Sequence, residues 1–168
     1  KFPFEKNYYT KIKILKKSAF DKATIEIPLG KNSEVFNIEG VTYNLAEDST
    51  IVKSFLKDDK VFKTKFYKSS TINSFTLPNV KVGSVIEYKY SIKSKNYGLY
   101  DWYFQSDIPK IKSSYEARVP PIFYFNIAYV GKINPSINSS KIKSKCIGVD
   151  PCQSYNYVLE NIPAFIEE

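Results

Sequence analysis

Histidine is absent from this chain of 168 residues, and so is methionine. Without histidine the chain lacks the usual general base, the commonest metal ligand and any Ser-His or Cys-His pair for nucleophilic catalysis. Its two cysteines cannot by themselves build a standard structural zinc site, which takes four Cys or His ligands. The sequence also contains no glycine-rich loop of the phosphate-binding kind. We therefore expect that this chain is not an enzyme and holds no metal or cofactor.

Arginine is almost missing as well, since Arg118 is the only arginine among 25 basic residues in a chain of net charge +8. Recognition of nucleic acids favours arginine, whose planar guanidinium binds phosphates and bases in a bidentate way, whereas lysine is a hydrated point charge. The lysines are spread along the polar sides of the expected strands, where they also discourage edge-to-edge aggregation. We expect a solvated basic surface and no nucleic-acid partner, with Arg118 paired to a carboxylate.

Long apolar runs are missing too. No run approaches the roughly 20 residues that a helix needs to cross a bilayer, so we expect a chain that does not span a membrane. The chain begins at Lys1 without a methionine. A processed or shortened chain would begin in this way, and any signal peptide would then lie upstream.

Aromatic residues are abundant, because 14 Tyr and 12 Phe help to raise the aromatic share to 16%. Aromatic and β-branched residues favour strands. Alternating patterns and turn signals predict about nine short strands and almost no helix, while residues 51–60 are compatible with a helix or a strand. We expect one all-β domain over residues 1–160, a two-sheet antiparallel sandwich of the immunoglobulin-like kind. The predicted strands cover residues 10–16, 23–29, 34–45, 61–67, 71–77, 84–93, 111–119, 123–130 and 153–159, and residues 100–105 are a strand or an extended aromatic segment.

The clearest pattern in the chain is Leu77-Pro-Asn-Val-Lys-Val-Gly-Ser-Val-Ile-Glu-Tyr-Lys-Tyr-Ser-Ile-Lys93. Pro78 and Gly83 bracket a turn, after which apolar and polar residues alternate strictly. A period of two predicts a half-buried antiparallel strand. Its inward residues are Ile86, Tyr88, Tyr90 and Ile92.

Together with Asp101-Trp-Tyr-Phe-Gln-Ser-Asp-Ile-Pro109, this segment resembles the domain-of-unknown-function family 3857. The resemblance is most specific over residues 77–120 and looser over residues 8–60 and 153–165. Members of that family usually precede a transglutaminase-like domain in envelope proteins of Bacteroidetes-type bacteria, and their fold is similar to an immunoglobulin-type sandwich. The resemblance implies a periplasmic, cell-envelope or secreted location. It also implies that residues 161–168 begin a linker to a downstream domain.

The function that the resemblance implies is that of a non-catalytic accessory domain. It would orient a transglutaminase-like cysteine-hydrolase domain of the same chain, or help present a protein or peptidoglycan-type substrate to it. A stand-alone module of the cell envelope that binds a glycan or a protein is the alternative. A Cys, His and Asp set beyond Glu168 would support the first hypothesis, and a chain that ends there would support the second.

Cys146 and Cys152 are the only cysteines, and the five residues between them include Gly148 and Pro151. A turn at these residues could bring the two sulfurs together. In an envelope protein we expect a structural disulfide, with two buried free thiols as the alternative. The spacing does not match the redox motif with two intervening residues. Closing so short a loop would add only about 2 kcal/mol in the chain-entropy description.

The end of the chain stays apolar after the last predicted strand, which ends at Leu159. A free terminus is normally polar and frayed, and exposed apolar patches commonly mark interfaces. We therefore expect an interface where the chain exits. Its candidate residues are Ile162, Pro163, Phe165 and Ile166, with Tyr103 as an extension.

Alternation within residues 100–105 sends Tyr100, Trp102 and Phe104 to one side and Tyr103 to the other. The first three are expected to fill the sandwich. A contact to a neighbouring domain and a platform for stacking on a glycan are the alternatives.

Overall fold

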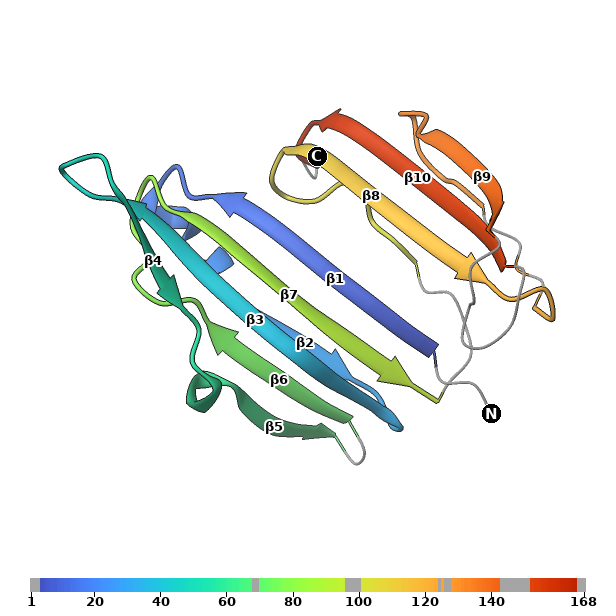
Figure 1. The fold of residues 1–168 in the computed structure, drawn as a ribbon, viewed down its shortest axis with the longest axis horizontal. Helices are drawn as coiled ribbons and strands as arrows, with labels where there is room; N and C mark the ends of the chain where they lie inside the picture. The colour runs from blue at the N-terminus through green and yellow to red at the C-terminus, as the bar shows by residue number, and fades with distance from the viewer. Residues whose placement is uncertain are drawn as a thin grey trace. The chain divides into compact units, whose positions relative to one another are not determined.

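The structure is a computed structural model of the chain. It describes residues 4–67, 70–95, 101–123, 125, 128–142 and 152–165. The chain divides into two compact units, Lys1–Gly98 and Leu99–Glu168. Both units are built from antiparallel strands, so the predicted all-β class is confirmed (Figure 1). The sequence did not indicate this division, and the predicted domain boundary near residue 160 stays a prediction.

The first unit contains two sheets over the residues that the structure describes. One sheet has the strand order β1-β7-β3-β4 and the other has the order β2-β6-β5. The strands and the two short 3-10 helices in this unit are β1 (Phe4–Lys13), η1 (Lys17–Ala23), β2 (Thr24–Leu29), β3 (Ser33–Leu45), β4 (Ile51–Phe55), η2 (Asp58–Lys60), β5 (Phe62–Tyr67), β6 (Ser70–Thr76) and β7 (Val85–Ser94).

The two sheets of the first unit pack face to face, as a sandwich requires. Ile86 on β7 is fully buried, and the ring of Tyr88 meets Phe75 of the opposite sheet edge-on, with the ring centroids 6.0 Å apart. Burying each large apolar side chain contributes roughly 1.5–3 kcal/mol to folding. The predicted sandwich is therefore present in this unit. Its core consists of Ile14, Ala23, Ile25, Ile27, Leu29, Phe75, Leu77 and Ile86.

Two details of the first unit concern strands β3 and β4. The segment 51–60 forms strand β4 followed by the single 3-10 turn η2 rather than one helix. Strand β3 contains a shift of pairing register between Phe36 and Glu39, beside Asn37 with a φ of 51°. An extra residue in one strand bends it locally, which is how a β-bulge interrupts a long strand.

The second unit contains β8 (Lys110–Val119), β9 (Ser136–Ile142) and β10 (Cys152–Ile162) in the order β8-β10-β9. One prediction about this unit is wrong. None of the described residues between 123 and 130 is in a strand, because a turn follows Pro120, whose carbonyl oxygen accepts the Phe123 N–H. Residues 101–105 are not in a strand, which leaves the extended aromatic segment, the other form predicted for them. The strand that pairs with β10 on the side opposite β8 is instead the polar segment β9.

Candidate functional site

The end of β10 and the loop before β8 lie together in the second unit. β10 continues to Ile162, three residues past its predicted end, and Ile162 pairs with Lys110 on β8. Beyond the strand, the carbonyl oxygen of Pro163 accepts a hydrogen bond of 3.0 Å from the Gln105 side chain. The Phe165 N–H donates a hydrogen bond of 2.7 Å to the carbonyl oxygen of Ser106. The exit segment is thus held by its own unit rather than frayed.

Large apolar side chains are exposed around this exit. Tyr103 is 76% exposed, Ile111 is 86% exposed and Phe165 is 59% exposed. Lys110 connects these positions, because its ammonium group donates to the Tyr103 carbonyl oxygen at 3.3 Å. We define the exit surface as Tyr103, Ile111, Pro163 and Phe165. Apolar groups gathered in this way are typical of interaction sites.

Two of the sequence-predicted interface residues do not belong to the exit surface as described. Ile162 is only 2% exposed and lies in the core of the second unit, which corrects its expected place at the interface. The reason is that β10 extends to this residue and that Asn161, with a φ of 52°, breaks the alternation, so that Ile162 is buried as Leu159 is. Ile166 lies outside the described residues. Ile111 was missed because it precedes the buried positions Ser113 and Ala117 on the same face of β8, and so looks like a core residue.

The aromatic residues near Tyr103 pack within the second unit. Trp102 and Phe104 are both half-buried and meet edge-on, with ring centroids 6.5 Å apart. Trp102 also stacks on Tyr115 of β8 at 6.0 Å and donates its ring N–H to Ser113 at 3.3 Å. These contacts occupy the ring faces that would stack on a sugar. They therefore favour the predicted inward placement of Trp102 and Phe104 over a platform for a glycan. Tyr100, the third predicted member, lies outside the described residues.

The cysteine and arginine predictions have different outcomes. Cys152 is 1% exposed at the start of β10. Its predicted partner, Cys146, lies outside the described residues, so the disulfide stays a prediction. The expected pairing of Arg118 with a carboxylate is confirmed, because its Nε lies 2.8 Å from Oε1 of Glu116.

An open cleft of about 430 Å³ lies in the first unit between the β3–β4 hairpin and the loop before β7. Its polar side chains bind one another. The buried Ser84 hydroxyl donates to Oδ1 of Asn44 at 2.5 Å, and the Asn44 amide donates to the carbonyl oxygen of Asn79 at 2.9 Å. The Asn79 amide then donates to the Ser54 hydroxyl at 3.0 Å. This network fixes the loop of the strongest sequence motif, which indicates a structural role for that motif.

Charged residues pair across the outer face of the sheet that contains β1 and β7. Lys11 Nζ lies 3.2 Å from Oε2 of Glu87, and the same ammonium group lies over the ring of Tyr43, 5.5 Å from its centroid. Burial by itself would raise the pKa of Glu87, but hydrogen bonds from Lys11 and Tyr9 and the Lys11 charge bring that pKa below its ordinary value. Pairs of this kind are ordinary cross-strand contacts on a solvated sheet face.

The fold and the exit surface define an all-β chain in which a sandwich is followed by a smaller sheet with an exposed apolar end. The sequence pattern of the domain-of-unknown-function family DUF3857, a family with a solved structure, matches residues 3–147, and the chain belongs to this family. No curated protein matches the chain. Helices long and apolar enough to cross a membrane are absent from the part of the chain that the structure describes.

Among solved structures, the chain is similar to a proposed protease from Parabacteroides distasonis. The two share 16% sequence identity and superpose with a TM-score of 0.69, and the match covers 99% of this chain. The chain spans about a third of the length of that protein, since only 34% of it is covered. At this level of identity the likeness shows a common fold.

Proposed function

We propose that this chain is a non-catalytic accessory domain in a secreted or periplasmic bacterial protein. It precedes and orients a transglutaminase-like cysteine-hydrolase domain of the same protein, or presents a protein or peptidoglycan-type substrate to it. The exit surface is the observation that carries this proposal. Its exposed aromatic side chains lie where the chain leaves the second unit, so a following domain would meet them first.

The hydrogen bonds of the exit segment give the proposal a physical basis. Two of them tie Pro163 and Phe165 to the loop that contains Gln105 and Ser106. A segment fixed in this way leaves its unit in a defined direction, whereas a flexible linker would let two domains tumble independently. Covering Tyr103 and Phe165 would add roughly 1.5–3 kcal/mol for each fully buried side chain.

Three further observations support the accessory role. The similar solved structure is described as a proposed protease and is about three times as long as the region matched here, which leaves room for a catalytic domain elsewhere in that protein. This chain contains no histidine, the residue that would complete a cysteine nucleophile. The packed state of Trp102 and Phe104 favours orientation of a neighbouring domain over a stand-alone glycan platform.

Calorimetry of the full-length protein tests the proposal. Phe165→Ala should lower the unfolding temperature of the downstream domain or separate its transition from that of this domain, because the coupling surface is truncated. Phe66→Ala is the matched control, since Phe66 is 73% exposed on β5 in the first unit. If the two variants behave alike, the exit surface does not couple the domains and the proposal fails.

A further inference from the structure

Two loops at one end of the first unit carry exposed apolar side chains. Leu15 is 74% exposed in the loop after β1, and Val82 is 47% exposed in the loop before β7. Hydrogen bonds join the two loops, because the Ile14 N–H donates to the Ser84 carbonyl oxygen at 2.8 Å and the Gly83 N–H donates to the Ile14 carbonyl oxygen at 2.7 Å. The two apolar side chains therefore share one rigid end of the sandwich. Phe20 on η1, 37% exposed, follows Leu15 in the same connection.

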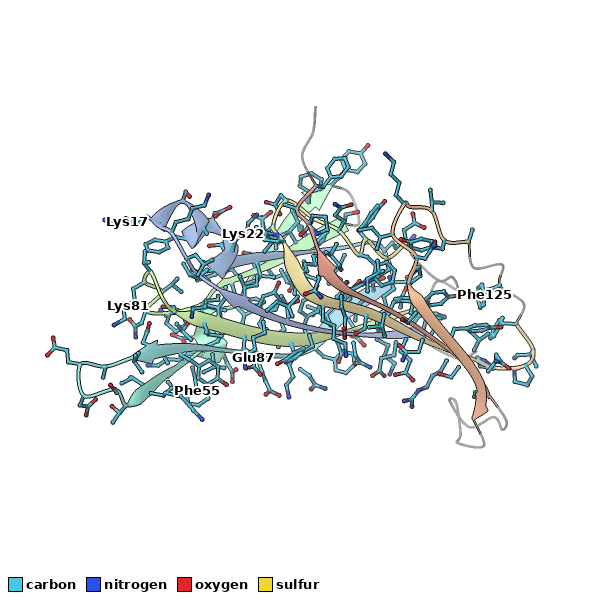
Figure 2. All side chains as sticks on the ribbon, turned by 90° about the horizontal axis from the view of Figure 1, so that it is seen from above. Lys17, Lys22, Phe55, Lys81, Glu87 and Phe125 are labelled. Carbon is cyan, nitrogen blue, oxygen red and sulfur yellow. The ribbon has the colours of Figure 1, made fainter. Side chains whose placement is uncertain are left out.

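Lysines flank these apolar side chains in the sequence. We define the basic tip as residues 13–22 and 80–84, which contain five lysines and one aspartate and so carry a net charge of +4. The aspartate, Asp21, lies 3.7 Å from the ammonium group of Lys22. Figure 2 shows Lys17 and Lys81 at the same end of the first unit. The lysines of the tip are Lys13, Lys16, Lys17, Lys22 and Lys81.

Nearby acidic residues reduce the positive charge of the tip but do not cancel it. The turn between β3 and β4 contains Glu47 and Asp48, and Lys81 reaches that hairpin by donating to the Leu45 carbonyl oxygen at 3.4 Å. Asp48 faces its own turn, because its carboxylate accepts hydrogen bonds from the backbone N–H and the hydroxyl of Thr50 at 3.0 Å and 2.6 Å. With these two carboxylates included, the end of the unit remains positive, at +2.

We propose that the basic tip docks on an anionic membrane surface, with Leu15 and Val82 entering the headgroup region and the lysines facing lipid phosphates. Stable attachment to a bilayer takes two signals, and apolar insertion together with a polybasic cluster supplies both. Leu15 and Val82 both lie in loops at the end of the unit. Side chains placed in this way can enter the flat surface of a bilayer together. Lysine suits diffuse attraction to many phosphates, whereas fixed pairing with one anion favours arginine. This docking is independent of the proposed role of the exit surface.

Vesicle sedimentation of the chain tests the proposal. We expect the chain to bind vesicles of phosphatidylcholine mixed with phosphatidylglycerol, to bind pure phosphatidylcholine weakly, and to be released near 1 M salt, where charges are screened within about 3 Å. Lys16→Gln together with Lys17→Gln should weaken binding to the anionic vesicles by roughly 25-fold, about fivefold for each lysine. Leu15→Ser should weaken it by roughly tenfold.

The matched control is Lys63→Gln together with Lys65→Gln, because both residues are exposed lysines on β5. This control should bind the anionic vesicles as the unchanged chain does. An equal loss in the control would mean that only the overall positive charge matters. Unchanged binding by Leu15→Ser would rule out apolar insertion, and binding to an acidic protein without binding to vesicles would identify a different kind of partner. Each of these outcomes would overturn the proposal.

Discussion

The backbone N–H of Phe165 donates a hydrogen bond of 2.7 Å to the carbonyl oxygen of Ser106. The bond joins the chain's exit to a loop that lies almost 60 residues earlier in the sequence. Its consequence is that the exposed Phe165 ring and the exposed Tyr103 ring belong to one unit with one orientation. An interface built on them therefore needs no folding of the exit segment when a partner domain binds.

Gly83→Ala should destabilise the first unit by roughly 1–2 kcal/mol. Gly83 has a φ of 92°, a backbone conformation that residues with a side chain rarely adopt. A Cβ added there would meet no atom within 4 Å, so the loss of stability comes from the backbone conformation and not from a clash. Gly30→Ala is the matched control, because its added Cβ also meets nothing within 4 Å and its φ is not in that range. Urea unfolding measures both variants. Equal stability of the two would contradict the positive φ at Gly83.

Strand β7, which follows Gly83, shows how much of the structure can be predicted from alternation in the sequence. A period of two requires only that one face be buried, so the inward residues of β7 could be predicted without knowledge of their partners. The hydrogen bonds that link Asn44, Asn79 and Ser84 could not be predicted, because they join residues 35 and 40 positions apart. Pairing partners over such distances are set by the whole fold.

The second unit shows where alternation fails. The segment 123–130 is rich in aromatic and β-branched residues, yet the turn after Pro120 keeps its described residues out of the sheet. Strand β9 has the polar sequence SINSSKI, whose pattern is weak, and it exists because β10 offers it a pairing edge. Likewise, burial of Ile162 follows from the extra length of β10 together with the positive φ of Asn161, which breaks the alternation. Local strand propensity cannot predict these features, because they depend on tertiary contacts.

Lys6 on β1 should make stability depend on pH. Burial lowers the pKa of Lys6 from 10.5 to about 8. Between pH 8 and 10.5 the unfolded chain therefore binds more protons than the folded chain, so stability rises with pH in that window. Lys110, whose pKa burial also lowers although Asp107 partly opposes this, acts in the same direction.

The test of this pH dependence is urea unfolding between pH 7 and 9.5, below the ordinary pKa of tyrosine. The free energy of unfolding of Lys6→Gln should rise less between pH 7 and 9.5 than that of the unchanged chain. Lys13→Gln, which removes an exposed lysine from the same strand, should keep the full rise. An identical pH profile for Lys6→Gln and the unchanged chain would show that the pKa of Lys6 is not lowered.

Cys146 and Cys152 should be joined in protein folded under oxidising conditions. The motivation is their short spacing and the buried place of Cys152 at the start of β10. Intact mass after alkylation, with and without a reductant, measures the state of both thiols. Two alkylated cysteines in the unreduced, denatured protein would contradict the disulfide.

The coupling role of the exit surface is tested most directly by amide hydrogen exchange in residues 101–108 and 161–165, compared between this chain alone and the full-length protein. Burial of Tyr103 and Phe165 by a following domain should slow exchange there by roughly tenfold or more in the full-length protein. Phe165→Ala should remove most of that difference, while Phe66→Ala should leave it intact. Equal exchange in the two proteins would mean that the exit segment is protected only by its own unit, and would contradict the account.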